Sequence, residues 1–259
     1  MADTEAAGGP NLSLIFPCYN EEQRLPATLA RVEEYLAGMG WSYEILIVDD
    51  GSRDRTLDVA RAAAARNPRI RALEYGENQG KGFAVRHGAL HARGERVLFS
   101  DADLSTPIQE LERFLPALEQ GYDVVIGSRA LKESRLEVRQ PWWRERAGRF
   151  MNFLIRALSG LPHPDTQCGF KLFTHQAARD LFDPLTVRRW MFDVEVLVLA
   201  RKLGYRVVDL PVTWVNSGES RVRVSHVFNI MKELLHIRWY WLLRTPPRAA
   251  RTAETGAAR

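Results

Sequence analysis

The chain of 259 residues has only two cysteines, Cys18 and Cys168, and they do not form a C-x-x-C pair. Two isolated cysteines disfavour both a disulfide framework and a thiolate zinc site. The sequence also lacks any run of about 20 apolar residues, the length that a membrane-spanning helix needs. Its first ten residues contain neither a basic region nor an apolar core, so they do not resemble a secretory signal. These absences predict a cytoplasmic protein that is soluble or peripheral to a membrane.

Positive charge is concentrated in two segments of the chain. Residues 135–156 contain six Arg and two Glu, and residues 219–259 contain seven Arg, one Lys and three Glu. Because the whole chain has a net charge of +4, the remainder is acidic. Both basic segments also contain Trp or Phe, a combination that favours an anionic membrane surface as partner and disfavours nucleic acid. A solvated helix face is the alternative for each segment alone.

The first half of the sequence alternates short apolar runs with helical stretches. The runs predict strands at 12–16, 43–48, 70–75, 96–100 and 123–127, and the stretches predict helices at 22–37, 54–66, 82–92 and 108–119. Repeated β-α units with short connections imply a mostly parallel sheet that is covered on both faces. The predicted fold class is therefore α/β.

The alternation stops after Ser128, which indicates a second half of different organisation. The pattern there predicts an amphipathic helix at 141–159, the segment DTQCGFKLF, a helix at 192–203 and short strands within 206–215. We expect this half to build the acceptor side of a site.

The same patterns predict one catalytic domain with appendages. The predicted parts are a catalytic domain at 11–218, divided into a nucleotide-binding half at 11–128 and an acceptor half at 129–218, a C-terminal amphipathic helical appendage at 219–244, and disordered tails at 1–10 and 245–259. The broad apolar face of the appendage must either pack on the domain or lie on a membrane.

Asp101 and Asp103 directly follow the predicted strand 96–100, in the sequence SDADLS. The period of two in a strand sends both carboxylates to one face at its C-terminal end, the edge where open α/β sheets bind ligands. A divalent cation held by two carboxylates keeps positions open for a diphosphate, and Ala102 lets a ligand come close. The alternative for an isolated D-x-D is that acidic residues merely end the strand and begin a loop.

Polar segments that contain glycine or acidic residues follow four successive predicted strands. They are PCYNEE at 17–22, VDDGSRDRT at 48–56, GENQGKG at 76–82 and the Asp pair. Because the carboxyl ends of parallel strands share one edge, we expect these segments to form a nucleotide-diphosphate cleft. A dinucleotide fingerprint is missing after the first strand, and GENQGKG lacks the spacing and the Ser or Thr of a P-loop. Dehydrogenases and P-loop NTPases are therefore disfavoured.

These motifs together resemble a known enzyme family. PCYNEE, VDDGSRDRT, NQGKG, SDADLS, SR at 128–129, DTQCGFKLF and WMFDVEVL are similar, in this order, to motifs of family-2 glycosyltransferases of the GT-A fold. The dolichyl-phosphate β-glucosyltransferases are most similar, from about Leu12 to Leu243, and dolichyl-phosphate mannose synthases resemble the N-terminal half. The resemblance implies inverting transfer of a hexose to a polyprenyl phosphate at the cytoplasmic face of a membrane, with Mg²⁺ or Mn²⁺. The implied donor is UDP-glucose, with GDP-mannose as the main alternative.

The resemblance also implies roles for individual residues. The nucleotide would contact Pro17, Tyr19, Glu21, Val48, Asp50, Lys81, Asp101 and Ala102, and the metal would be held by Asp101 and Asp103. The sugar and acceptor would contact Arg129, Gln167, Gly169, Arg189 and Glu195, and the catalytic residues would be Asp103, Asp165 and Asp193. Two other interpretations stay open: Lys81 as a solvated surface residue, and Asp193 and Glu195 as acids that merely start a helix.

The chemistry of the acceptor decides what Asp193 must do. A hydroxyl acceptor needs a carboxylate base, whereas a lipid phosphate is already ionised at neutral pH, so Asp193 would then orient the acceptor without deprotonating it. Two alternatives belong to other classes: a soluble transferase with a hydroxyl acceptor, and a catalytically silent scaffold that docks on membranes through 226–244.

Overall fold

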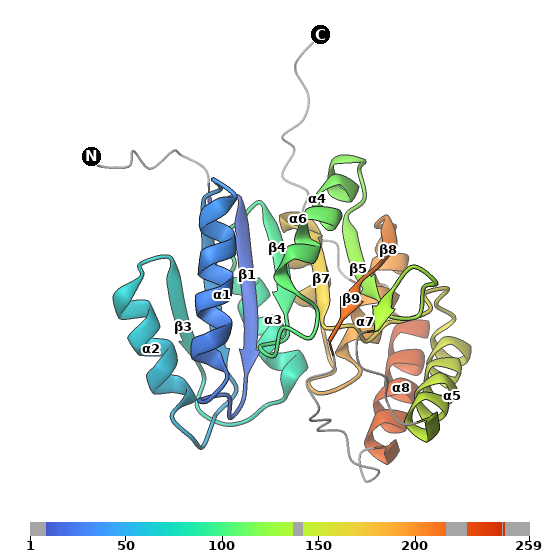
Figure 1. Cartoon of the computed structure of the whole chain (residues 1–259). Coiled ribbons are helices and arrows are strands. Elements are labelled where there is room, and N and C mark those ends of the chain that lie inside the picture. The colour runs from blue at the N-terminus through green and yellow to red at the C-terminus, as the bar shows by residue number, and fades with distance from the viewer. Residues whose placement is uncertain (1–8, 137–141, 216–226, 245, 247–259) are drawn as a thin grey trace.

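The computed structural model describes residues 9–136, 142–215, 227–244 and 246 (Figure 1). In this part of the chain seven strands form one sheet in the order β3-β2-β1-β4-β7-β5-β8. Their bounds are β1 Leu12–Cys18, β2 Tyr43–Asp49, β3 Ile70–Glu74, β4 Arg96–Ser100, β5 Val124–Ser128, β7 Phe170–Thr174 and β8 Val207–Pro211. A second, two-stranded sheet pairs β6 Arg135–Leu136 with β9 Thr213–Trp214. The predicted α/β class is confirmed.

One strand departs from the parallel order of the main sheet. β7 lies between β4 and β5 and is antiparallel to both. The sequence analysis names DTQCGFKLF only as a segment and does not predict this strand. Because β7 is inserted there, β5 is not the neighbour of β4, although the two are successive apolar runs in the sequence. The insertion also brings residues 165–169 to the end of β4, since the amide of Asp101 donates a hydrogen bond to the carbonyl of Gly169.

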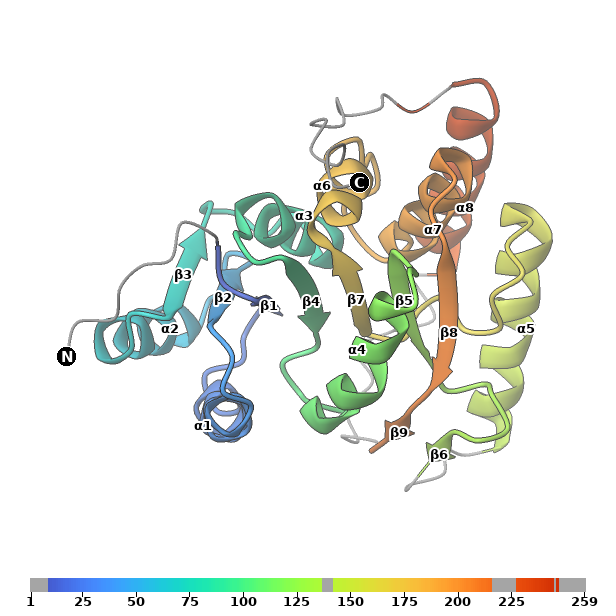
Figure 2. The same ribbon diagram turned by 90° about the horizontal axis from the view of Figure 1, so that it is seen from above.

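Alternating side chains of the strands build a core on each face of the sheet. In β1, Leu14 and Phe16 join one buried cluster and Ile15 joins the other. The helices are α1 Leu25–Gly38, α2 Thr56–Arg66, α3 Lys81–His91, α4 Leu111–Glu119, α5 Trp142–Ser159, α6 His175–Phe182, α7 Phe192–Leu203 and α8 Val227–Leu242, with a short 3₁₀ turn at Ile108–Glu110. Figure 2 shows α1 and α4 on one side of the sheet and α3, α6 and α7 on the other. The predicted double cover is therefore confirmed.

Helix α6 is an element that the sequence analysis does not predict. Its N-cap is Thr174, whose hydroxyl accepts a hydrogen bond from the amide of Ala177 at 3.3 Å. The helix has only eight residues and follows β7 directly. A helix of this length shows few turns of apolar periodicity, so its pattern merges with that of the preceding strand.

Helix α8 packs on the domain with one face and exposes the other. Its inner face buries Ile230, Leu234, Ile237 and Trp241 in the core. Its outer face exposes Phe228, Leu235, Trp239 and Leu242, followed by Leu243. Figure 1 shows α8 beside α5, on which Phe150 and Phe153 are also exposed. Within the described ranges no helix has both the length and the apolar character to cross a bilayer.

Some predicted segments lie outside the described residues. They are most of the two predicted tails, residues 137–141 and 216–218 of the predicted catalytic domain, and residues 219–226 at the start of the predicted appendage.

Candidate active site

A cavity of about 390 Å³ opens at the carboxyl ends of β1, β2 and β4. These strands are parallel neighbours, so the segments that follow them meet there. Predicted site residues in its lining are Pro17, Tyr19, Glu21, Asp50, Lys81, Asp101, Ala102, Asp103 and Arg189. The lining also contains Cys18, Arg24, Asn78, Gly80, Ala84 and Trp190, which the sequence analysis does not select. The four polar segments thus converge as predicted.

Asp50 organises the loop that forms one wall of the cavity. Its buried carboxylate accepts hydrogen bonds from the hydroxyl of Tyr75 at 2.8 Å, the side-chain amide of Asn78 at 2.9 Å and the amide of Gln79 at 2.7 Å. The loop then turns into α3 at Gly80, whose φ of +104° is a conformation that favours glycine. Burial and the neighbouring Asp50 carboxylate raise the pKa of Tyr75, so its hydroxyl remains a donor. Asp50 therefore shapes this wall of the cavity through the loop that it holds.

The two aspartates of SDADLS both line the cavity, with Ala102 between them. Asp101 Oδ1 forms an ion pair with Lys81 Nζ at 2.6 Å, and Asp103 Oδ1 accepts a hydrogen bond from the amide of Ser105 at 2.8 Å. The Asp101 side chain is 38% exposed and that of Lys81 is 28% exposed, so a ligand in the cavity can reach both. Burial acts to lower the pKa of Lys81, but Asp101, Asp193 and Asp103 outweigh it and raise the pKa. Lys81 is therefore a cation at neutral pH.

The acidic pair fits a Mg²⁺ or Mn²⁺ ion that is shared with a diphosphate. Two carboxylates beside an open cavity supply hard oxygen ligands and leave the other positions of an octahedral ion to water and phosphate oxygens. Among residues 9–136, 142–215, 227–244 and 246, no group of three or more His, Cys, Asp or Glu side chains is placed to hold a metal. The two carboxylates would therefore share the ion with water and with phosphate oxygens.

Arg129 and Asp165 form a bidentate ion pair next to the acidic pair. Arg129 Nε and Nη2 lie 2.7 and 3.0 Å from the two carboxylate oxygens of Asp165, and the Arg129 amide donates to the same carboxylate at 3.0 Å. Burial acts to raise the pKa of Asp165, but Arg129 outweighs it and holds the pKa below its ordinary value. Asp165 is thus ionised and orients the guanidinium, which is close enough to Asp101 to interact with its charge.

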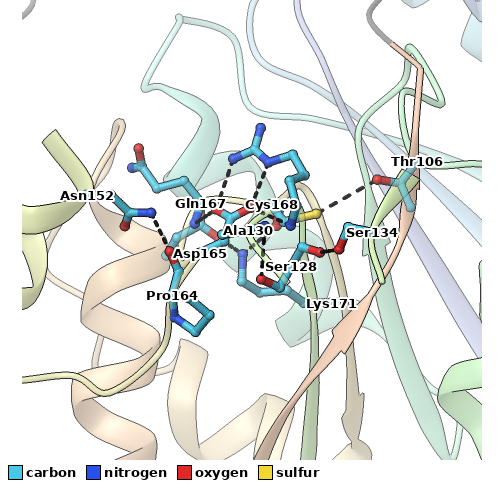
Figure 3. A network of polar contacts seen from close by, with 12 residues as sticks. Thr106, Ser128, Ala130, Ser134, Asn152, Pro164, Asp165, Gln167, Cys168 and Lys171 are labelled. Carbon is cyan, nitrogen blue, oxygen red and sulfur yellow. Dashed lines mark hydrogen bonds and ion pairs between the residues drawn. The ribbon is translucent and has the colours of Figure 1, made fainter. Parts of the chain in front are cut away.

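Lys171 is a fully buried lysine that the sequence analysis does not select. Its ammonium donates to Asp193 Oδ1 at 2.5 Å and to the carbonyl of Cys168 at 2.6 Å, and it lies 5.2 Å from the ring centre of Phe99. Figure 3 shows Lys171 beside Cys168 and Asp165. Burial raises the pKa of Asp193, opposed by the charges of Lys171 and Lys81. A lysine inside an apolar strand is almost never buried without a partner, so FKLF contained a signal for this ion pair.

The predicted site residues that do not line the cavity are Val48, Arg129, Asp165, Gln167, Gly169, Asp193 and Glu195. Two of them, Glu195 and Val48, have contacts that do not fit the predicted role. Glu195 is fully buried and accepts hydrogen bonds from the amide and hydroxyl of Thr186, the amide of Val187 and the indole of Trp241. It joins α7 to the preceding loop and to α8, so the predicted contact with the sugar does not fit its position. Val48 is fully buried in β2 on the face that α3 covers, because the strand alternation turns it into the core. The predicted contact of Val48 with the nucleotide does not fit either.

Contacts within residues 167–191 and with α8 position the part of the cavity wall that Arg189 and Trp190 form. Gln167 Nε2 donates to the carbonyl of Trp190 at 3.3 Å, and Trp190 lines the cavity together with Arg189. Glu233 of α8 accepts hydrogen bonds from the amides of Trp190 and Met191 at 3.2 and 3.0 Å. Helix α8 therefore fixes the backbone of Trp190, which forms part of the cavity wall.

The arrangement of the sheet agrees with solved glycosyltransferase structures. The glucosyl-3-phosphoglycerate synthase of Mycobacterium tuberculosis, solved with Mn²⁺, UDP and glucosyl-3-phosphoglycerate, aligns with 88% of this chain and 78% of that chain, at a TM-score of 0.63 and 15% identity. A mannosyltransferase of Pyrobaculum calidifontis, solved with GDP-Man and Mn²⁺, aligns with 94% of this chain and 67% of that chain, at a TM-score of 0.57 and 22% identity. At such identities the likeness shows the fold, which is the GT-A fold of glycosyltransferases.

The sequence comparisons show the family. Residues 13–182 match the model of glycosyl transferase family 2, and the chain belongs to this family. A dolichyl-phosphate beta-glucosyltransferase of Trichomonas vaginalis is 39% identical over 243 residues, which are 90% of this chain and 74% of the relative. The enzymes of that name from Drosophila melanogaster and Homo sapiens are 40% and 34% identical, over 82% and 89% of this chain and 69% and 76% of their own lengths.

Proposed function

We propose that this glycosyltransferase moves glucose from UDP-glucose to a polyprenyl phosphate of the dolichyl type, with Mg²⁺ or Mn²⁺, at a membrane surface. The observation that supports this most strongly is the meeting of Asp101, Asp103 and Lys81 in one cavity beside the loop that Asp50 orders. The names of the similar relatives agree with the proposed sugar and acceptor.

The donor side of the reaction follows from the lining of the cavity. Asp101 and Asp103 would hold the ion, and a bound ion would neutralise charge on the departing diphosphate. Lys81 would stay within reach of the phosphate oxygens, because charge-assisted hydrogen bonds to phosphate are strong. The nucleoside would lie against Pro17, Tyr19, Glu21 and the wall ordered by Asp50.

The contacts of Asp193 and Arg129 support an acceptor that is already ionised. Asp193, the candidate base, is bound to the ammonium of Lys171 and buried with it, which makes proton removal from a hydroxyl difficult. Arg129 uses Nε and Nη2 for Asp165, and within the described part of the chain its Nη1 has no hydrogen-bond partner. A guanidinium with a free N–H edge suits a phosphate oxygen. We therefore assign Arg129 to the acceptor phosphate, with Asp165 and Gln167 as positioning residues.

The outer surface of α5 and α8 supports contact with an anionic membrane. The exposed apolar side chains of the two helices lie next to cationic ones, and Lys232 Nζ lies 4.5 Å from the ring centre of Phe228. Exposed aromatic and aliphatic side chains among cations are typical of helices that lie in the headgroup layer. This surface would place the enzyme at the cytoplasmic face, where its lipid acceptor is embedded.

The proposal is tested with purified protein, polyprenyl phosphate and Mn²⁺. Radiolabelled UDP-glucose and GDP-mannose are offered in parallel reactions, and label in the organic phase is counted. We expect organic label from UDP-glucose alone. Label from GDP-mannose alone would show that GDP-mannose is the donor and UDP-glucose is not. The absence of label from both donors, together with the absence of Mn²⁺-dependent nucleotide binding in calorimetry, would overturn the proposal.

The variant Asp193→Asn separates a phosphate acceptor from a hydroxyl acceptor. Asparagine keeps an oxygen that can accept the hydrogen bond of Lys171 but has no basicity. We expect transfer to a polyprenyl phosphate to remain within about 10-fold of the wild type, because loss of a general base typically costs about 10²- to 10⁴-fold. Thermal unfolding of the variant shows whether the fold is kept. A loss of more than about 100-fold in a folded variant would favour the soluble transferase with a hydroxyl acceptor.

The variant Gly169→Ala tests whether the position of Asp101 matters for the metal. A Cβ at residue 169 would lie 2.0 Å from Asp101 Oδ2, so the carboxylate must move. We expect Mn²⁺-dependent UDP binding, measured by calorimetry, to weaken at least about 10-fold. Gly38→Ala is the matched control, because a Cβ there meets nothing within 4 Å. Equal affinities of the two variants would contradict the assigned role of Asp101.

A further inference from the structure

We propose that a groove beside α5 binds the first isoprene units of the lipid acceptor, next to the acceptor phosphate; this rests on the function proposed above. The groove has a volume of about 610 Å³ and lies between α5 and the segment that follows it. Its walls include Ala130, Phe153, Ala157, Leu161 and Pro164. Sites for small ligands occupy about 300 to 1,000 Å³, so the groove is large enough to hold several isoprene units.

The groove is apolar where a hydrocarbon chain would lie. Its polar side chains are Asn152 and Arg156, and Asn152 Nδ2 already donates a hydrogen bond to the carbonyl of Pro164 (Figure 3). This hydrogen bond joins α5 to the segment that follows it. It also satisfies the Asn152 amide and the Pro164 carbonyl, so these groups bind less water in the groove. An apolar, concave surface gains free energy when hydrocarbon replaces water on it, at roughly 25 cal/mol for each Å² buried. A soluble, polar acceptor would gain nothing comparable there.

Both walls of the groove lead directly to the proposed phosphate site. Ala130 follows Arg129 in the chain, and Pro164 precedes Asp165, so the Arg129–Asp165 ion pair adjoins two residues that line the groove. The segment that follows Asp165 reaches the donor cavity, because the carbonyl of Gly169 accepts a hydrogen bond from the amide of Asp101 at 3.1 Å. An amphiphile with its phosphate at Arg129 would therefore present that phosphate toward the donor and its chain toward α5.

The other end of the groove borders the exposed apolar surface of α5. Phe153 belongs to the groove and is 65% exposed, and Phe150, one turn away on the same helix, is exposed to a similar extent. Helix α8 packs beside α5 and exposes Trp239 and Leu242. A chain that leaves the groove thus meets more apolar surface, and contiguous apolar surface of this kind marks membrane or partner contact. Together with the phosphate site proposed at Arg129, this continuity favours a lipid chain as the occupant.

The test fills the groove without changing the donor cavity. Ala157 is exposed on α5, so Ala157→Trp can be accommodated while its ring occupies the groove. Using farnesyl phosphate as acceptor, we expect the KM for the acceptor to rise at least about 10-fold. The affinity for UDP and Mn²⁺ in calorimetry should be unchanged. Ala65→Trp, at an exposed position of α2 far from the groove, is the matched control and should leave both quantities unchanged.

A second measurement does not depend on turnover. A photoreactive analogue of farnesyl phosphate is bound and irradiated, and the labelled peptide is found by mass spectrometry. Labelling within residues 150–164 that Ala157→Trp suppresses supports the groove. Labelling elsewhere, or equal acceptor KM values for Ala157→Trp and Ala65→Trp, overturns it. If the wild type labels this segment but transfers no glucose to farnesyl phosphate or a longer polyprenyl phosphate, the proposed function fails while the groove stands.

Discussion

Asp103→Asn is expected to lower glucose transfer by roughly 100-fold or more and to abolish the effect of Mn²⁺ on UDP binding. Asparagine keeps the side-chain oxygen that accepts the hydrogen bond from the amide of Ser105, so the turn after Asp101 should keep its shape. What is lost is the charge of one of the two carboxylates that face the cavity. A neutral amide is a weak ligand for a divalent ion and leaves the diphosphate charge uncompensated.

Calorimetry with UDP, with and without Mn²⁺, measures the binding effect, and initial rates measure transfer. Asp58→Asn is the matched control, since Asp58 is exposed on α2 and does not line the cavity. Thermal unfolding of both variants should equal that of the wild type. Metal-stimulated UDP binding that survives in Asp103→Asn would show that the acidic pair does not hold the ion. The same result would favour the alternative of a catalytically silent scaffold, whose function does not depend on Asp103.

Lys171→Met is expected to have the largest effect on stability, a loss of about 3 to 5 kcal/mol in the free energy of unfolding. The change leaves the Asp193 carboxylate buried without the cation 2.5 Å away, and it leaves the carbonyl of Cys168 without the ammonium that it accepts from. Urea unfolding measures the loss. Because burial raises the pKa of Asp193, the loss should shrink as the pH falls and the carboxylate takes up a proton. Transfer activity should fall as well, since Lys171 joins the 165–169 loop to α7.

The double variant Lys171→Met, Asp193→Asn separates the ion pair from other effects of the lysine. It removes both charges, so it should be more stable than Lys171→Met alone, with a coupling energy of about 1 kcal/mol or more. Lys202→Met, at an exposed position of α7, is the control for loss of a lysine and should change stability by less than about 0.5 kcal/mol. Additive effects in the double variant would show that Lys171 and Asp193 do not depend on each other.

The part of the site at the ends of β1, β2 and β4 follows from sequence to a large extent. Each segment there comes directly after a strand with a clear apolar pattern, and parallel strands place such segments at one edge of the sheet. Asp101, Asp103, Lys81, Tyr19 and Asp50 therefore lie together, as predicted. Val48 is the exception, because a single position in a fully buried strand can face either side and the sequence pattern is apolar on both.

The second half of the chain depends on contacts between residues far apart in the sequence. Glu195 occupies the first turn of a helix, where an acid is ordinary, and only the packing of α8 reveals that its carboxylate bonds to Trp241, 46 residues later. Lys171 likewise reads as one polar residue in an apolar strand. Its function appears only once β7 is inserted between β4 and β5 and faces α7.

The sequence alone determines the α/β class, the double cover of the sheet and the acidic edge at the carboxyl ends of the strands, because strand periodicity and the segments that follow strands are local properties. The tertiary structure alone decides the antiparallel place of β7, the pairing of Lys171 with Asp193 and of Arg129 with Asp165, and the groove beside α5. The physical reason is that a buried charge is stable only beside its partner, and the partner is chosen by how distant segments pack.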